Sequence, residues 1–176
     1  MNRRTSLALG TTALLSLGVA LSGSAFAQQK SLKEQITGTW TLVSNDGFAA
    51  DGTKQQLFGP NPRGILLLDA SGRYSQTIVS PDVPKFKINN RLKGTPEENT
   101  AAVHGTTATF GSWSIDEASK TVTVRYEGGM FPNQAGTDSK RTVSVSGNEM
   151  KVSNPATASG FRAEQVWKRA TTVASR

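Results

Sequence analysis

The sequence contains no cysteine and only one histidine, His104. Without cysteine the chain can form neither disulfides nor thiolate metal sites, and it has no cysteine nucleophile. The motifs of phosphate-binding loops, dinucleotide folds, hydrolase nucleophile elbows and zinc proteases are also missing. A lone histidine beside Gly105 is more typical of a surface or helix end than of a metal site, which needs partner ligands. The sequence therefore predicts no catalytic residue, metal or cofactor.

Acidic residues are scarce relative to basic ones. The chain has 13 Asp and Glu against 20 Lys and Arg, a net charge of +7. A basic surface favours anionic partners such as lipid headgroups or carboxylate ligands. Neither an aromatic-rich basic patch nor a helix-turn-helix pattern accompanies this charge, so no nucleic-acid partner is predicted.

The long apolar run of a membrane-spanning helix is also lacking. Residues 7–21 are mostly apolar but interrupted by Gly and Thr, and they fall short of the roughly 20 residues that a span needs. Arg3-Arg4 before this run and Ala25-Phe26-Ala27 after it are typical of a secretory signal peptide. We expect residues 1–27 to be removed by either the Sec or the Tat route. Residues 28–176 would then form one periplasmic or secreted domain.

What remains is a series of short strands separated by turns. Three hairpins are predicted from apolar residues joined by turn residues: 65–69 with 73–79, 110–115 with 121–127, and 140–146 with the strand through Met150 and Val152. Further strands are expected at 39–46, 54–58 and 162–169, after a helical turn at 32–36. Eight or nine antiparallel strands predict an all-β fold, either an up-and-down barrel or a sandwich.

A long excursion, residues 80–105, separates the first two hairpins. Thr95-Pro96-Glu97-Glu98 predicts a short helix over 96–103, with Thr95 as its N-cap. In an extended chain over 85–93, the apolar residues would share one face and the basic ones the other. These are Phe86, Ile88 and Leu92 against Lys85, Lys87, Arg91 and Lys93. The pattern predicts either a lid over a barrel mouth or a solvated loop anchored by its apolar residues.

A set of short motifs occurs in one order along the chain. They are Gly38-Thr39-Trp40, Asp51-Gly52, Phe58-Gly59, Gly64, Gly72-Arg73-Tyr74-Ser75, Phe110-Gly111-Ser112-Trp113, Phe131-Pro132-Asn133, Gly136-Thr137-Asp138 with Arg141, and Trp167-Lys168-Arg169. Together they resemble the bacterial lipocalin-like domain family, and the resemblance favours the barrel. It implies that Trp40 plugs the closed end and that Arg169 packs across its ring. Members often carry histidine before Phe-Pro-Asn, where this chain has Val124-Arg125, which argues against histidine-dependent chemistry.

A barrel of this size can enclose one small ligand in a mostly apolar pocket. The candidate ligand-binding residues are Tyr74, Gln76, Phe86, Phe110, Tyr126 and Arg141, and the structural signature is Gly38, Trp40, Trp113 and Arg169. An unpaired arginine facing inward would be costly. The residues alone therefore favour a salt bridge at the rim for Arg141, with Asp138 or Glu127. For Tyr74 and Tyr126, ordinary core packing explains the pattern at least as well as ligand contact does.

These features and the resemblance predict an exported monomer that binds a small, largely apolar or amphipathic ligand, with an anionic group where Arg141 takes part. Two alternatives stay open. The barrel pocket could serve an isomerase or cyclase, which would need Tyr, Glu or Arg groups with perturbed pKa values to converge in it. The basic segment 85–93 could instead dock on an anionic membrane surface or another envelope component.

Overall fold

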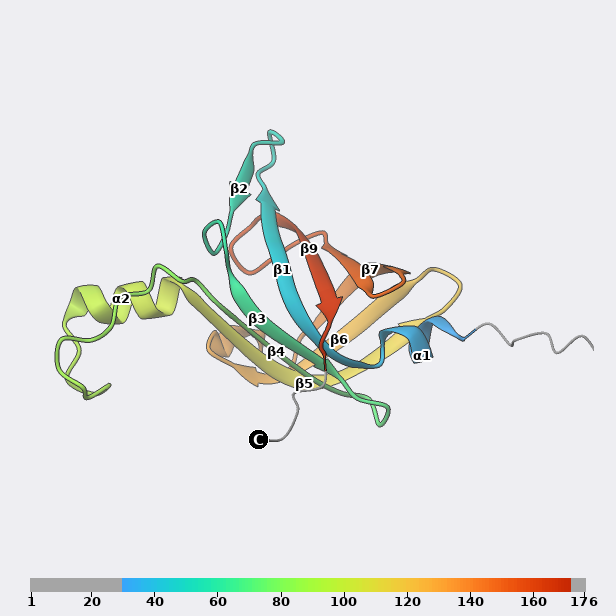
Figure 1. Cartoon of the computed structure of the whole chain (residues 1–176), viewed down its shortest axis with the longest axis horizontal. Coiled ribbons are helices and arrows are strands. Elements are labelled where there is room, and N and C mark those ends of the chain that lie inside the picture. Colours follow the sequence, from blue (N-terminus) through green and yellow to red (C-terminus); the bar gives the residue numbers. More distant parts are fainter. Residues whose placement is uncertain (1–29, 172–176) are drawn as a thin grey trace, which may run out of the picture.

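The computed structural model describes residues 30–171, and the expected signal peptide, residues 1–27, lies outside them. One antiparallel sheet of nine strands makes up most of the described chain (Figure 1). The elements are α1 (Leu32–Ile36), β1 (Gly38–Phe48), β2 (Lys54–Gln56), β3 (Arg63–Leu68), β4 (Arg73–Val79), α2 (Pro96–His104), β5 (Thr106–Asp116), β6 (Thr121–Gly129), the 3-10 turn η1 (Pro132–Gln134), β7 (Asp138–Ser146), β8 (Glu149–Asn154) and β9 (Arg162–Arg169). The predicted number of strands is confirmed.

Strand β1 closes the sheet into a barrel. One edge of β1 pairs with β9, from Trp40 opposite Arg169 to Phe48 opposite Arg162. The other edge pairs first with β3 and then, beyond a gap, with β2. Eight strands therefore form the closed ring, and β2 is an extra strand that extends the wall near the mouth. Closure leaves no long unpaired edge, which distinguishes this fold from a sandwich.

Trp40 lies at the closed end, completely buried, and its indole N–H donates to the carbonyl of Ile36 at 2.8 Å. The guanidinium of Arg169 lies 4.2 Å from the centre of its ring and donates to the carbonyls of Thr37, at 3.1 Å, and Gln35. Gly38 has a φ of +128°, and a Cβ there would lie 3.0 Å from Arg169 Nη1. The expected contact between Arg169 and Trp40 is thus present, and glycine leaves room for it.

Helix α1 covers the closed end because the turn between β5 and β6, at the same end of the barrel, holds it. The carboxylate of Glu117 accepts the backbone N–H groups of Leu32 and Lys33, both at 2.8 Å. These are first-turn donors that have no partner within the helix. The indole N–H of Trp113 donates to the carbonyl of Asp69 at 3.0 Å, which fastens the β3–β4 turn to β5.

The barrel interior changes character along its axis. Cross-strand neighbours share a face, so the register identifies the inward side chains. Near the closed end they are apolar and buried: Trp40, Leu42, Leu66, Leu68, Trp113, Val143, Met150, Val152 and Trp167. Toward the mouth they include Asn45, Gln76, Thr109, Tyr126, Ser139 and Arg141. A polar layer therefore lies above the apolar lower half, and beyond Gln76 on β4 the fully buried Ile78 is apolar again.

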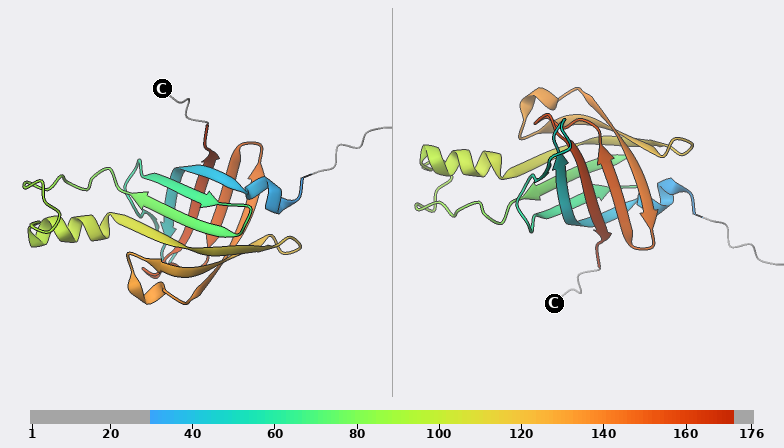
Figure 2. Two further views of the ribbon diagram at one scale, coloured as in Figure 1. Left: turned by 90° about the horizontal axis from the view of Figure 1, so that it is seen from below. Right: turned by 90° about the horizontal axis from the view of Figure 1, so that it is seen from above.

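The excursion of residues 80–105 projects away from the barrel instead of crossing its mouth (Figures 1 and 2). Helix α2 begins at Pro96 as predicted. Thr95 Oγ1 accepts the N–H of Glu98 at 3.2 Å, and the Glu98 carboxylate accepts the N–H of Thr95 at 2.9 Å. The same carboxylate accepts the N–H of Lys87 at 2.8 Å, so the segment before the helix is tied to the helix itself.

Of the two alternatives for residues 85–93, the extended lid over the mouth is wrong and the solvated loop is nearer to the structure. These residues form bends and a turn, and Ile88 and Leu92 are 57% and 84% exposed. The physical reason is local: Pro84 and the turn at Asn90 interrupt extension, and the Glu98 carboxylate holds the backbone. The alternation of apolar and basic residues therefore does not describe a surface that closes the barrel.

Candidate ligand-binding site

Four of the predicted site residues meet inside the barrel, in its polar upper half. Arg141 of β7 donates from Nη1 to Gln76 Oε1 at 3.0 Å and from Nη2 to the phenol oxygen of Tyr126 at 2.5 Å. Tyr74 of β4 donates to the same Gln76 oxygen at 2.8 Å. The rings of Tyr74 and Tyr126 meet edge to face, with centroids 6.3 Å apart. Three separate strands thus supply one connected polar cluster.

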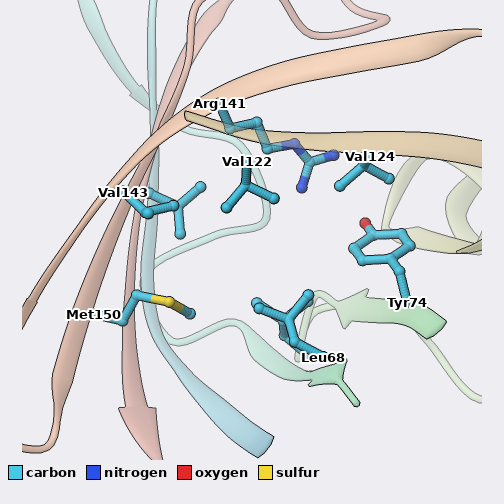
Figure 3. Close-up of a pocket in the computed structure, with 9 residues that line it drawn as sticks. Leu68, Tyr74, Val122, Val124, Arg141, Val143 and Met150 are labelled. Atoms are coloured by element: carbon cyan, nitrogen blue, oxygen red, sulfur yellow. The ribbon is translucent and has the colours of Figure 1, made fainter. Parts of the chain in front are cut away.

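Both phenol rings also lie close to the charge of Arg141. The guanidinium carbon is 5.7 Å from the centre of the Tyr74 ring and 5.9 Å from that of Tyr126. Figure 3 shows the guanidinium of Arg141 and the hydroxyl of Tyr74 pointing toward one another from opposite sides of the pocket. The rings partly offset the cost of burying the charge.

Arg141 has no acidic partner among the described residues. It is 7% exposed, and its remaining hydrogen bond runs from Nε to Ser139 Oγ at 3.4 Å. A guanidinium has five N–H donors. Three are used, so two have no acceptor in the described part of the chain. A buried cation in this condition is unusual, because burying charge without a counter-charge is costly.

The salt bridge at the rim that the sequence favoured for Arg141 is therefore wrong. The two acids considered for it lie on the outside, each paired with another arginine. Asp138 bonds Arg125 at 3.0 Å, and Glu127 bonds Arg73 at 2.7 Å. Both pairs join neighbouring or nearby strands on the outward face, whereas Arg141 alternates inward with Val143.

Tyr74 is suited to donate a hydrogen bond rather than to accept a proton. Burial raises its pKa above the usual value, and this effect outweighs the nearby charge of Arg141, which lowers the pKa. Its oxygen also lies 3.0 Å from Thr109 Oγ1. At neutral pH the phenol therefore stays protonated, and the cluster consists of a fixed cation, two hydroxyls and an amide.

Directly beneath the cluster lies a cavity of about 20 Å³. Its walls are Leu66, Leu68, Tyr74, Val122, Val124, Arg141, Val143, Met150 and Val152. A water molecule needs roughly 10–15 Å³ of such space. The cavity can hold a single water, and an organic ligand requires side chains to move apart.

The loop that follows β2 packs against the inner wall of the barrel near the mouth, above the cluster. A Cβ on Gly47, which faces inward on β1, would lie 2.5 Å from Leu57 Cδ2, so Leu57 fills the space beside Gly47. Phe58 packs against the core from the same loop. The cross-strand partner of Gly47 on β9, Ala163, is also small. Because the inward residues of the wall are small here, Leu57 and Phe58 from the loop can pack against it.

The other two predicted ligand residues lie elsewhere. Phe110 is 49% exposed on the outward face of β5, and its ring covers Gly128. Phe86 packs on Gly94 within the excursion. The Phe110 side chain points outward because its cross-strand partner, Ser75, alternates with the inward Tyr74.

Sequence reasoning missed three residues of the site region. Thr109 lies opposite Gln76, and Asn45 is 4% exposed with its Oδ1 lacking any partner among the described residues. Leu57 at the mouth is the third. The sequence contained a signal for Asn45, because a polar residue on the buried face of a predicted strand needs a hydrogen-bond partner and is therefore a candidate site residue. No local pattern marked Leu57.

A second hollow lies outside the barrel, open to solvent, with a volume of about 240 Å³. It is lined by Leu57, Phe58, Gly59, Ser80, Asp82, Val83, Ala101, His104 and Gly105. His104 therefore belongs to the base of the excursion and not to the barrel. In residues 30–171 no three His, Asp or Glu side chains gather as metal ligands would. Within the same range, no helix has the length and apolar character to cross a bilayer.

A lipocalin-like protein from Bacteroides uniformis is similar at 13% identity, over 76% of this chain and 97% of that one, with a TM-score of 0.40. Two mutants of the fluorescent protein UnaG are similar at 13% identity, over 79% of this chain and 99% of theirs, with TM-scores of 0.37 and 0.36. No curated protein matched. The model of the lipocalin-like domain family matches residues 37–176, and the chain belongs to that family.

Proposed function

We propose that the barrel binds a small amphipathic molecule whose anionic group, such as a carboxylate, is held by Arg141. The observation that carries this function is the guanidinium itself, buried, without an acidic partner among the described residues and with two unused N–H donors. A carboxylate matches the planar fork of an arginine and can accept two hydrogen bonds from it. Such a ligand would supply both the missing charge and the missing acceptors.

The free space around Arg141 decides where each part of such a molecule would lie. The anionic head would meet Arg141 and the hydroxyl of Tyr126 in the polar layer. Because the cavity below this layer holds only about 20 Å³, the apolar part has most room above it, toward the mouth. Leu57 and Phe58 now fill that region, beside Gly47. Binding therefore requires the loop of residues 57–62 to move outward.

The chemistry of the cluster favours binding over catalysis. The Tyr74 phenol has a raised pKa and Arg141 stays charged, so neither takes a proton at neutral pH. Among the described residues, Glu98 and Arg141 are the buried charged groups, and Glu98 lies in the excursion. An isomerase or cyclase would need a proton acceptor or a similarly reactive group at the ligand.

The same proposal includes action outside the cytoplasm, supported by the signal-peptide pattern of residues 1–27. The mass of the protein isolated from its own cells tests this part. A chain that begins at Gln28 is expected, and an intact N-terminus in the isolated protein would contradict it.

The binding test compares three probes of equal length, decanoate, decanol and decylamine, by calorimetric titration. Decanoate is expected to bind the protein at least about tenfold more tightly than decanol, since a charge-assisted bond contributes roughly 1.5–3 kcal/mol. Decylamine should bind worst, because its charge repels Arg141. Arg141→Met should remove the preference for decanoate, and Lys140→Met, an exposed neighbour on β7, should keep it.

Native mass spectrometry of protein isolated from its own cells supplies a second readout. A co-purifying small anion that is absent from Arg141→Met would support the proposal. Equal affinity for all three probes in both variants, together with no co-purifying molecule, would refute it.

A further inference from the structure

The excursion forms a small structured arm beside the barrel. Figures 1 and 2 show α2 and the segment before it extending together away from the strands. Glu98 bonds the backbone of Lys87 and Thr95, and Asn99 Nδ2 donates to the carbonyl of Gly94 at 3.2 Å. These bonds hold the segment of residues 85–95 against α2, so the exposed side chains of the arm have defined positions.

A tight turn at the end of this segment places an apolar residue between two cations. The N–H of Lys93 donates to the carbonyl of Asn90 at 3.0 Å, and the N–H of Leu92 donates to Asn90 Oδ1 at 2.9 Å. Arg91 and Leu92 are therefore the central residues of the turn. Leu92 is 84% exposed, and Ile88, 57% exposed, lies just before the turn.

Charge at this tip has one sign. Residues 85–93 contain Lys85, Lys87, Arg91 and Lys93 and no acid. All four are exposed, and none forms a salt bridge within residues 30–171. Exposed arginines elsewhere, such as Arg73 and Arg125, pair with carboxylates across strands. Apart from the Glu98 carboxylate, which lies near Lys87, the tip thus keeps its positive charge available.

We infer that this tip, residues 85–93, docks on the surface of an anionic lipid bilayer. Leu92 and Ile88 enter the interface while the four cations remain at the level of the headgroups, where each contributes to attraction. Two exposed apolar side chains are far too few for a stable protein interface, which buries over 1,000 Å² in total. They suffice for reversible insertion into a fluid bilayer. The inference is independent of the ligand site in the barrel.

Sedimentation with vesicles tests the docking. The vesicles contain either phosphatidylcholine alone or phosphatidylcholine with about one third phosphatidylglycerol, at low and high salt. The protein is expected to bind the anionic vesicles at low salt and to be released by high salt. Replacing Lys85, Lys87, Arg91 and Lys93 by Gln should weaken binding about tenfold or more. Ile88→Ser with Leu92→Ser should weaken it about tenfold at unchanged charge.

The matched control replaces four exposed lysines outside the excursion, Lys30, Lys140, Lys151 and Lys168, by Gln. It should bind nearly as well as the parent, and all variants are compared as the same chain beginning at Gln28, so any contribution of the N-terminus cancels. Equal loss in the control, no effect of the double serine variant, or binding to heparin without binding to vesicles would each overturn the inference. Thermal unfolding checks that every variant remains folded, and Arg141→Met should bind vesicles normally.

Discussion

Arg141 and Tyr126 meet across strands β6 and β7 inside the barrel, where the guanidinium Nη2 donates to the phenol oxygen at 2.5 Å. Because the arginine can only donate, the phenol must accept, and its own hydrogen is left to bind something else. That hydrogen and the two unused N–H groups of Arg141 are all donors. A site made of converging donors around a fixed positive charge selects an acceptor-rich anion.

Replacing Arg141 by methionine should separate stability from binding. The buried cation is costly, and apolar residues of similar size often replace buried charges without loss. We expect the change in the free energy of unfolding to lie between a loss of about 1 kcal/mol and a gain of about 3 kcal/mol. Urea denaturation at neutral pH measures the change. A loss of several kcal/mol would instead assign Arg141 to the support of the fold.

Shortening Leu57 should open the mouth. Leu57→Ala removes the side chain that fills the space beside Gly47. We expect decanoate to associate about three- to tenfold faster, since the bound form needs this loop displaced. Stopped-flow fluorescence of the tryptophans would follow the rate. Leu67→Ala is the matched control, because Leu67 is a leucine on the outward face of β3, 39% exposed, and it should leave the rate unchanged.

Removing Arg169 should weaken the closed end without affecting the ligand site. Arg169→Ala deletes the contact with the Trp40 ring and leaves the carbonyls of Gln35 and Thr37 without their donor. The expected loss is about 2–4 kcal/mol of unfolding free energy. Lys168→Ala, on the exposed face of the same strand, should stay within roughly 0.5 kcal/mol of the parent. An equal effect of both substitutions in urea denaturation would contradict the role assigned to Arg169.

The turn between β3 and β4 should become less stable in acid. Asp69 accepts the N–H of Arg73 at 2.8 Å and the hydroxyl of Ser71 at 2.7 Å, and these bonds hold its pKa below the usual value. A depressed pKa in the folded state means that the unfolded chain binds the proton first as pH falls. The contribution of Asp69 is thus complete above about pH 4 and is lost as pH falls further.

Asp69→Asn tests this dependence. The urea midpoint of the variant should lie below that of the parent at pH 7, and the two should converge as the pH falls below about 4. A difference that stays constant over this range would show that the carboxylate charge is not responsible.

Local structure was predictable because turn chemistry and capping lie in neighbouring residues. Strand β9 and helix α1 occupy the predicted residues 162–169 and 32–36, and α2 starts at Pro96. The inward orientation of Arg141 also followed from its alternation with Val143. These features depend on period and on side-chain type within a few positions.

Long-range pairing was not predictable in the same way. The salt bridges of Asp138 with Arg125 and of Glu127 with Arg73 depend on the register between strands. The residues next to each acid in the sequence do not indicate these partners. Leu57 entered a predicted strand over 54–58, but β2 ends at Gln56 and the next residues fold over the mouth. In the excursion the helix was predicted correctly but the extended path before it was not, because the bond from the Lys87 N–H to the Glu98 carboxylate joins residues eleven positions apart.

The seam between β1 and β9 joins the two ends of the domain, with Trp40 opposite Arg169. During synthesis the other hairpins can form in order as the chain emerges, but the ring stays open until the last strand is made. Contacts between residues so distant in sequence form slowly. The free edges of β1 and β8 are therefore exposed for the whole of that interval, and a chain that ends before residue 162 would keep them exposed permanently, as templates for association with other copies.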